Sequence, residues 1–289
     1  MRLATFNVLH GRRIQDGRPV AVPATVAAEA PLAEAVASLN ADVLALQELD
    51  RLQERSGRVD QAAVAAAAAG MRDWRYAAAV HGRSTPDRGW VLDPSERGLR
   101  VHGPRDAPSQ GEVPSHGVAL MSRLPVRVWR ARRLAPAPLG LPLRVAGRPG
   151  LTRVRDQPRA ALAAVLEGRH GTLTVVALHL SFVPGWNIRQ LLVVRDWIAD
   201  LPHPHVLLGD FNLIGAIPRA VLNATGLMSP VRPGGWRDLA RRPTYPAHRP
   251  VVQFDHALAQ GVGVEAVGTA RTPRTAISDH RPLVVEVSL

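Results

Sequence analysis

The amino-acid sequence predicts an α+β protein in which stacked β-sheets are covered by helices. Strand-like apolar runs are numerous, and several follow one another with only a short polar stretch between them. Segments with helical spacing stand singly among these runs, which favours sheets covered by helices. The chain has 289 residues, 46% of them hydrophobic, enough for one large core or two small ones. Because no repeat or linker divides the chain, we expect one domain over residues 1–289.

The N-terminal part contains two predicted strands and two predicted helices. Leu3–Val8 is an apolar run that we expect to be a strand. Pro31–Asn40 has apolar residues at helical spacing, and a proline is acceptable in the first turn of a helix. Val43–Gln47 is apolar without alternation, which indicates a strand buried on both faces. Asp60 is the expected N-cap of an alanine-rich helix that ends at Gly70.

The middle of the chain combines long loops with strands. His81–Pro114 is rich in Gly, Pro and charged residues, and we interpret it as a long surface loop. Such a loop in a compact domain is functional or disordered in most cases. His116–Met121 and Val126–Leu134 are expected to pair as neighbouring strands. Ala135–Gly150 is a second loop rich in Pro and Gly.

The C-terminal half predicts a hairpin, two helices and several single strands. Arg159–Leu166 and Leu173–Leu180 are separated by turn-forming residues and are expected to form the hairpin. Helical spacing, or a terminating glycine, predicts helices over Asn187–Ala199 and Pro218–Gly226. Further apolar runs predict strands at His205–Leu208, Val251–Ala259, Val262–Ala270 and Pro282–Val287.

The composition favours an anionic partner. The formal net charge is +12, and every basic residue is Arg, since the sequence contains no Lys. This charge favours nucleic acid, phospholipid surfaces or phosphorylated metabolites. There is no Cys, so thiolate metal sites are excluded. No apolar run is long enough to span a bilayer, and we expect a cytoplasmic, monomeric protein without an integral membrane segment.

Polar side chains recur at the ends of the strand-like runs. Strands from distant parts of the chain that all end in such groups suggest one shared cleft. Hard oxygen ligands with imidazoles and no thiols suit a divalent hard cation that acts on a phosphate. The residues concerned are Asn7, Glu48, His179, Asp210, Asn212, Asp279 and His280.

Two of these segments have a local physical reason to be examined closely. Gly209 lets the backbone turn sharply after a strand, so that Asp210 and Asn212 project from one turn. An Asx turn that merely ends a strand would explain the same residues. Asp255 lies in an apolar segment, where an unpaired carboxylate is costly, which predicts a buried cationic partner.

These segments resemble, in content and order, the endonuclease/exonuclease/phosphatase superfamily. The resemblance runs from Thr5-Phe6-Asn7, through Gln47-Glu48, His179 and Gly209-Asp210-Phe211-Asn212, to Ser278-Asp279-His280. The superfamily includes deoxyribonuclease-I-like nucleases, abasic-site endonucleases, neutral sphingomyelinases and inositol-polyphosphate phosphatases. The resemblance implies a four-layer α/β/β/α sandwich of two packed mixed β-sheets flanked by helices.

The resemblance also implies roles for individual residues. Glu48 is similar to the principal Mg²⁺ (or Mn²⁺) ligand, with Asn7 and Asp279 nearby. Asp210 resembles the base that activates water, and Asn212 the residue that orients that water and the phosphate. The imidazoles implied to stabilise the pentacovalent phosphorus are those of His179 and His280, and Asp255 is implied to orient His280. The residues implied to bind the phosphate are Asn7, Arg159 and Asn212.

The sequence departs from the family pattern at one position. Gln157 stands where many relatives carry Glu two residues before the arginine that corresponds to Arg159. The carboxylate partner of His179 is then absent from that position, unless Asp156 takes its place. We expect both imidazoles to be cationic at the phosphate, since a carboxylate beside an imidazole keeps it protonated.

The function implied is a divalent-metal-dependent phosphodiester hydrolase, an endonuclease or exonuclease that acts on DNA or RNA by in-line attack of an activated water. A phosphatase or phosphodiesterase of lipid (sphingomyelinase-like) or inositol-phosphate-like substrates is the alternative. A non-catalytic binding module on the same fold is a third hypothesis. We expect the loops at 81–114 and 135–156 to influence substrate choice, because fold alone does not fix function.

Overall fold

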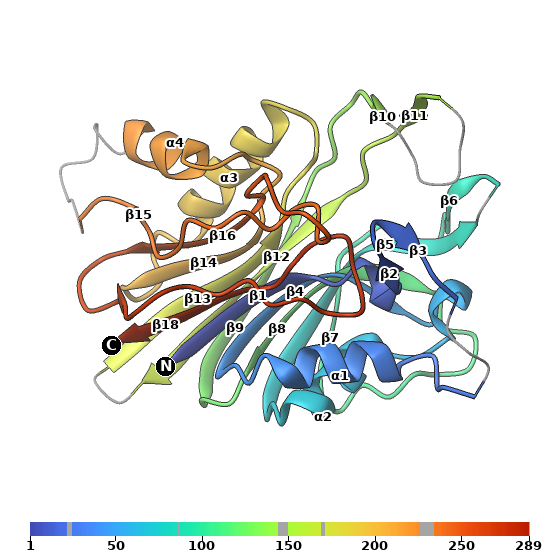
Figure 1. Cartoon of the computed structure of the whole chain (residues 1–289), viewed down its shortest axis with the longest axis horizontal. Coiled ribbons are helices and arrows are strands. Elements are labelled where there is room, and N and C mark those ends of the chain that lie inside the picture. The colour runs from blue at the N-terminus through green and yellow to red at the C-terminus, as the bar shows by residue number, and fades with distance from the viewer. Residues whose placement is uncertain (22–24, 86, 144–149, 169–170, 226–233, 289) are drawn as a thin grey trace.

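The structure is a computed structural model, which describes residues 1–21, 25–85, 87–143, 150–168, 171–225 and 234–288. Two large β-sheets pack face to face at its centre (Figure 1). The first contains, in spatial order, β17 (Glu265–Ala266), β18 (Leu283–Ser288), β1 (Arg2–Asn7), β4 (Val43–Arg51), β8 (Ser115–Ser122), β5 (Asp73–Thr85) and β6 (Gly89–Leu92), and β7 (Arg100–His102) also pairs with β5. The second contains β15 (Arg237–Asp238), β16 (Asp255–Gln260), β14 (His205–Asp210), β13 (Gly171–His179), β12 (Arg159–Gly168) and β9 (Val126–Leu134).

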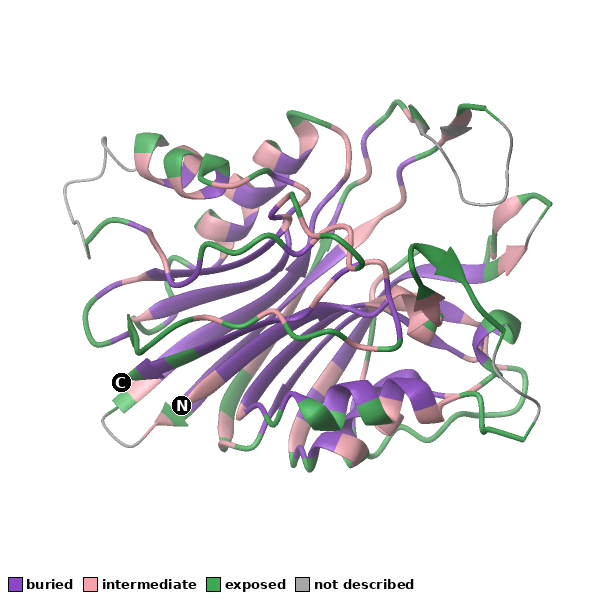
Figure 2. Ribbon diagram, in the orientation of Figure 1, coloured by how far each residue is buried: buried purple, intermediate pink, exposed green. Residues whose placement is uncertain are grey.

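Helices cover the outer face of each sheet, as the resemblance implied. α1 (Ala30–Ser38) and α2 (Gln61–Ala69) bury Leu32 and Ala62 against the first sheet. α3 (Trp186–Trp197) and α4 (Ile217–Thr225) bury Leu191 and Leu222 against the second. Between the sheets lies an apolar layer drawn from both, and the central strands are buried along most of their length (Figure 2). The layers are therefore α/β/β/α, and the predicted fold class is confirmed.

The register of five strands brings the polar site residues together. β1 and β4 are parallel, with Asn7 beside Gln47. β13 and β14 are also parallel, with His179 beside Asp210. β16 runs antiparallel to β14 and places Asp255 opposite Asp210. Since parallel strands point their carboxyl ends to the same edge, these side chains meet at one end of the sandwich.

The predicted pairing of the strands at 116–121 and 126–134 is wrong. β8 pairs with β4 and β5 in the first sheet, whereas β9 pairs with β12 in the second. The short connection between them crosses from one sheet to the other. Its residues, Ser122 to Pro125, have the composition of a hairpin turn, so the local sequence does not distinguish the two arrangements.

The segment predicted as a loop at 81–114 contains strand residues. β5 extends to Thr85 and forms a hairpin with β6, and β7 adds to the edge of β5. The first part of β5 was not predicted, because its run of three alanines has low strand propensity. Instead, β5 is stabilised by the burial of these alanines beside β8.

Shorter elements complete the chain. β2 (Ile14–Gln15) pairs with β3 (Arg18–Pro19), and β10 (Leu141–Leu143) pairs with β11 (Thr152–Val154). One-turn helices lie at Leu9–Gly11 and Glu54–Ser56. Residues 144–149 of the predicted loop at 135–156 lie outside the described residues. Among the helices that the structure describes, none has the length and apolar character needed to cross a membrane.

The predicted boundaries of the last strands were too wide. β16 begins at Asp255 rather than at residue 251, and β17 is limited to two residues within the predicted run 262–270. Val251 and Val262 are 70% and 90% exposed, so the apolar character of their side chains does not reflect burial in a sheet. The hairpin of β12 and β13, in contrast, agrees with its prediction.

Candidate active site

Asn7 links two carboxylates that come from different sheets. Its amide Nδ2 donates to Glu48 Oε1 at 3.1 Å and to Asp210 Oδ2 at 3.0 Å. Its Oδ1 accepts from the backbone N–H of Leu9 at 3.1 Å, and Ser278 Oγ donates to its carbonyl at 2.6 Å. Three of the predicted site residues thus share one hydrogen-bonded group, with Asn7 and Asp210 at the ends of β1 and β14 and Glu48 within β4.

Glu48 occupies a strained backbone position. Its φ is +60°, and the pairing of β4 with β8 shifts register between Leu46 and Leu49. A bulge of this kind re-aims a side chain, and non-glycine residues with positive φ often lie at functional sites. Burial alone would raise the pKa of Glu48, but the nearby His179, His116, His10 and Arg159 lower it to about 2. The group is therefore a carboxylate at neutral pH.

Asp210 is a buried carboxyl group with an elevated pKa. Its Oδ1 accepts from the backbone N–H of Asn212 at 3.0 Å. Burial, with a smaller contribution from Asp255, raises the pKa of Asp210 to about 6 against the opposing effect of His280. Gly209, which precedes it within β14, allows the close approach of β13, since a Cβ at residue 209 would lie 2.0 Å from the carbonyl oxygen of Leu178. Such a pKa is close to that of an effective general base.

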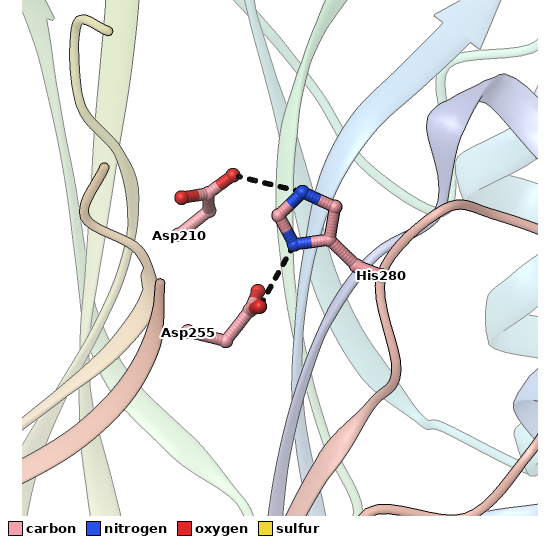
Figure 3. A group of neighbouring side chains, drawn as sticks. All are labelled: Asp210, Asp255 and His280. Atoms are coloured by element: carbon pink, nitrogen blue, oxygen red, sulfur yellow. Dashed lines mark hydrogen bonds and ion pairs between the residues drawn. The ribbon is translucent and has the colours of Figure 1, made fainter. Parts of the chain in front are cut away.

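His280 and Asp255 form a buried pair (Figure 3). His280 Nδ1 donates to Asp255 Oδ2 at 2.8 Å, and its Nε2 lies 3.9 Å from Asp210 Oδ2. Burial alone would lower the pKa of His280, but the charge and hydrogen bond of Asp255, with Asp210 and Asp279, raise it to about 10. His280 is therefore an imidazolium at neutral pH, and the buried cationic partner predicted for Asp255 is present.

His179 has an arginine, not a carboxylate, as its closest partner. Arg159 Nη1 lies 3.1 Å from Nδ1 and 3.2 Å from Nε2 of the ring, and Asp210 Oδ2 is 3.7 Å from Nε2. Burial and the Arg159 charge hold the pKa of His179 well below its ordinary value. The expectation of two cationic imidazoles is thus wrong for His179. The positive charge at this end of the site is carried by Arg159.

Asp156 does not replace the missing glutamate. Its Oδ2 accepts from Ser181 Oγ at 2.6 Å and from the backbone N–H of Ala137 at 2.7 Å. Its Oδ1 lies 3.8 Å from Arg159 Nη2. Asp156 therefore positions Arg159 and the chain around Ser181, and reaches His179 only through that arginine.

Asn212 and Asp279 lie at the margins of this group. Asn212 has a φ of +50°, and its Nδ2 donates to the carbonyl of Leu180 at 3.0 Å, so its amide nitrogen is engaged by the backbone. Asp279 is half-buried. Burial, together with the negative charge of Glu48, raises the pKa of Asp279 against the effect of His280.

The donor set around Glu48 fits a hard divalent cation. Glu48 and Asp279 are two buried or half-buried carboxylates near enough for the charge of one to raise the pKa of the other. A cation between them would relieve that repulsion, and oxygen-only ligands suit Mg²⁺. Asp210, Asp255 and His280 also have ligand atoms within 4.8 Å of one another. In that cluster, however, His280 Nδ1 and Asp255 Oδ2 are already hydrogen-bonded to each other at 2.8 Å, so we take Glu48 and Asp279 as the candidate ligands.

A pocket opens beside Glu48 and His179. It has a volume of about 170 Å³ and is walled by residues of both sheets and of the β11–β12 connection. Cationic side chains from Arg55, Arg155 and Arg159 line it together with aromatic rings from Trp90 and Phe182. Glu48 is the one carboxylate among its described lining residues. The pocket is therefore suited to an anionic substrate.

Sequence reasoning missed three residues of this pocket and its wall: Asp50, Arg55 and His116. Asp50 lies two residues after Glu48 on β4, so its side chain was a candidate for the same neighbourhood. Trp90 and His116 are brought to it only by the pairing of β5 with β6 and β8, which the sequence did not predict. No local signal marked Arg55.

The sequence matches a known family over most of its length, and the fold matches solved structures. A sequence model of the Endonuclease/Exonuclease/phosphatase family matches residues 4–280. No curated protein matches the sequence. An endonuclease/exonuclease/phosphatase from Beutenbergia cavernae is similar in structure, with a TM-score of 0.58 and 22% identity, over 100% of this chain and 71% of that one.

Two further solved structures cover both chains completely. A family protein from Leptotrichia buccalis has a TM-score of 0.60 and 13% identity, over 100% of both chains. A mannosyl-6-phosphatase from Bacteroides thetaiotaomicron has a TM-score of 0.55 and 14% identity, also over 100% of both chains. At these identities the likeness concerns the fold alone.

Proposed function

The chain belongs to the Endonuclease/Exonuclease/phosphatase family, and we propose that it is a divalent-metal-dependent phosphodiester hydrolase that cleaves nucleic acid by attack of an activated water. The observation that carries this proposal is the convergence of Glu48, Asn7, Asp210 and the Asp255–His280 pair at one end of the sandwich. That arrangement supports the assignment of a base, a cationic acid and a hard-oxygen metal ligand to neighbouring side chains at this end.

Asp210 is proposed to accept the proton of the attacking water. Its pKa of about 6 leaves it ionised at neutral pH and still basic enough to take a proton. Asn7 and the backbone N–H of Asn212 fix the two carboxylate oxygens. The water oxygen forms a bond to phosphorus as the bond to the leaving oxygen breaks, and the products are an alcohol and a phosphate ester.

Positive charge stabilises the phosphoryl oxygens as negative charge grows on them. The His280 imidazolium is held by Asp255, and Arg159 provides a second fixed cation beside His179. Removal of one such preorganised donor costs about 3 kcal/mol of transition-state stabilisation. His179, neutral in this environment, is proposed to orient the phosphate by hydrogen bonding.

The proposed metal ligands are Glu48 and Asp279, with Asn7 as a positioning residue for Glu48. A divalent cation held there would polarise a phosphoryl oxygen and stabilise its charge. Asn7 was expected among the ligands themselves, but its Nδ2 donates to Glu48 and its Oδ1 accepts from Leu9. We assign it the task of fixing Glu48 and Asp210 relative to each other.

Nucleic acid is the substrate class that the charge favours. The chain carries a net charge of +12, and exposed arginines such as Arg132 and Arg133 lie on the edge strand β9. A small phosphoester, such as a sugar or inositol phosphate, is the second candidate, and the small volume of the pocket, about 170 Å³, favours it. The lipid alternative is a further outcome of the experiment.

The experiment is a hydrolysis screen with Mg²⁺ or Mn²⁺. Plasmid DNA, RNA, bis-(p-nitrophenyl) phosphate, sphingomyelin, mannose 6-phosphate and inositol phosphates are each offered to the purified protein. We expect cleavage of DNA or RNA, with binding that weakens steeply as salt increases through counterion release. The double variant Arg132→Ala, Arg133→Ala should flatten that dependence. Hydrolysis of small phosphoesters alone would replace nucleic acid by the second candidate.

A further inference from the structure

The wall of the pocket opposite His179 is organised by one buried carboxylate. Asp50 is fully buried, and its oxygens accept from Arg55 Nε and Nη2 at 2.8 and 2.9 Å. His116 Nδ1 lies 2.7 Å from Asp50 Oδ1. Burial would raise the pKa of Asp50, but Arg55 and His116 hold it far below its ordinary value. As an ionised carboxylate is only an acceptor, His116 donates from Nδ1 and its ring orientation is fixed.

Arg55 and His116 in turn hold the indole of Trp90. Arg55 Cζ lies 5.1 Å from the centroid of the Trp90 ring, a cation–π contact. The rings of Trp90 and His116 are tilted by 48° with centroids 5.3 Å apart. Arg55 Nη1 also donates to Ser84 Oγ at 3.0 Å, which fastens the guanidinium to β5. Trp90 is therefore preorganised at the pocket, although it lies on a short edge strand.

The remaining lining of the pocket is mostly apolar. It is contributed by Ala79, Val80, Val118, Val154, Pro158, Ala160 and Phe182. Gln157 is the one amide side chain among the described lining residues. The pocket is continuous with the reaction centre, because Glu48, Arg159 and His179 line it as well. An occupant bound with its anionic end at these three residues would place its remainder against the aromatic and apolar side chains of the same lining.

We propose that this pocket receives a planar aromatic ring that the substrate carries next to its scissile phosphate. This inference rests on the proposed function, since it places the phosphate at Glu48 and Arg159. A volume of about 170 Å³ lies below that of pockets for drug-sized ligands and suits a single ring beside the phosphate. An aromatic ring can stack on Trp90 or Phe182.

The test measures binding, not turnover, with two small anions that differ only in the ring. Calorimetry of the Mg²⁺-loaded protein compares phenylphosphonate with methylphosphonate. We expect the phenyl compound to bind about 5- to 100-fold more tightly, the range expected for one stacking contact. Trp90→Ala should remove most of that preference, and Trp90→Phe should retain a large part of it.

Trp129→Ala is the matched control. Trp129 also carries an arginine over its ring, with Arg75 Cζ 5.3 Å from the centroid, but it lies on β9 and does not line the pocket. This variant should keep the preference for the phenyl compound. Equal binding of the two phosphonates by the unmodified protein, or an equal loss in Trp90→Ala and Trp129→Ala, would overturn the proposal.

A second pair of probes identifies the source of the ring. Uridine 5′-monophosphate is compared with ribose 5-phosphate in the same measurement. Preference for the nucleotide, lost in Trp90→Ala, supports a nucleobase as the occupant, and preference for phenylphosphonate alone supports another aryl group. A protein that binds the ring but hydrolyses nothing would contradict the proposed function and leave this inference standing. Hydrolysis without any ring preference would support the proposed function and overturn this inference.

Discussion

Asp210 and Asp255 lie opposite each other on adjacent antiparallel strands, and both are almost completely buried. Two carboxylates in such a place repel each other and lose their hydration. His280 relieves this repulsion, because its ring lies within 2.8 Å of Asp255 and 3.9 Å of Asp210. In the mechanism that we propose, the two acids have different tasks: Asp255 holds the imidazolium, and Asp210, with a pKa raised to about 6, is the base.

Asp255→Asn should therefore impair hydrolysis by removing the charge that keeps His280 protonated and oriented. We expect kcat/KM to fall by about 10²- to 10⁴-fold, as for other carboxylates that orient a catalytic imidazole. The measurement is steady-state hydrolysis of bis-(p-nitrophenyl) phosphate. Asp200→Asn is the control, since Asp200 is 65% exposed and pairs with Arg130 on the surface. An equal effect of the two substitutions would contradict the role of Asp255.

Glu48→Gln should weaken metal binding at the site rather than abolish folding. Loss of one carboxylate from an oxygen-ligand set reduces its affinity for Mg²⁺. We expect the Mg²⁺ concentration for half-maximal activity to rise by about 10-fold or more, and EDTA to remove the activity of both proteins. Glu54→Gln, at an exposed position, should leave the Mg²⁺ requirement unchanged. Full activity after exhaustive chelation would exclude a metal-dependent mechanism.

Gly209→Ala tests the backbone that presents Asp210. The added Cβ would lie 2.0 Å from the carbonyl oxygen of Leu178 on the neighbouring strand, so the pairing of β13 with β14 must shift. We expect the free energy of unfolding to fall by about 1–3 kcal/mol, as in other overpacked cores. Urea unfolding measures it. Gly98→Ala is the control, because a Cβ added at that position would meet no atom within 4 Å. A Gly209→Ala protein of unchanged stability would show that the strands approach less closely.

His205 should make the protein sensitive to acid. Its ring is buried, Nε2 lies 3.0 Å from the carbonyl oxygen of Leu201, and burial lowers the pKa of His205 from 6.5 to about 4. Since the pKa is lower in the folded state, the contribution to stability is complete above pH 6.5 and is lost as pH falls toward 4. His205→Gln should lose less stability than the unmodified protein over this window. Urea unfolding at several pH values decides it, with exposed His248→Gln as the control.

Local patterns predicted those parts of the fold that local physics determines. The hairpin of β12 and β13, the Asp60 cap and Gly70 end of α2, and the strand before Asp210 agree with the structure. β8 and β9 were assigned to one sheet because the connection between them resembles a hairpin turn, whereas each strand finds its partners far away in the sequence. Such non-local pairing has no signature within the segment itself.

The candidate site was likewise predictable from the sequence only in part. Polar residues that follow apolar runs in the sequence, such as Asn7, Glu48 and Asp210, were predictable, and the structure brings them into contact through Asn7. The low pKa of His179 was not predictable from the sequence, because it depends on burial and on the position of Arg159. The pocket wall that contains Asp50 and Trp90 depends on the pairing of β5 with β6 and β8. The first part of β5 was not predicted, because its sequence is rich in alanine.

The central claim is that Asp210 activates water for phosphodiester hydrolysis. The most direct test is the rate of bis-(p-nitrophenyl) phosphate hydrolysis with Mg²⁺ by Asp210→Asn, beside the unmodified protein and the control Asp196→Asn, whose side chain is 67% exposed. We predict a fall of about 10²- to 10⁴-fold for Asp210→Asn alone, with a melting temperature close to that of the unmodified protein. An Asp210→Asn protein that is folded and retains full activity would contradict this claim.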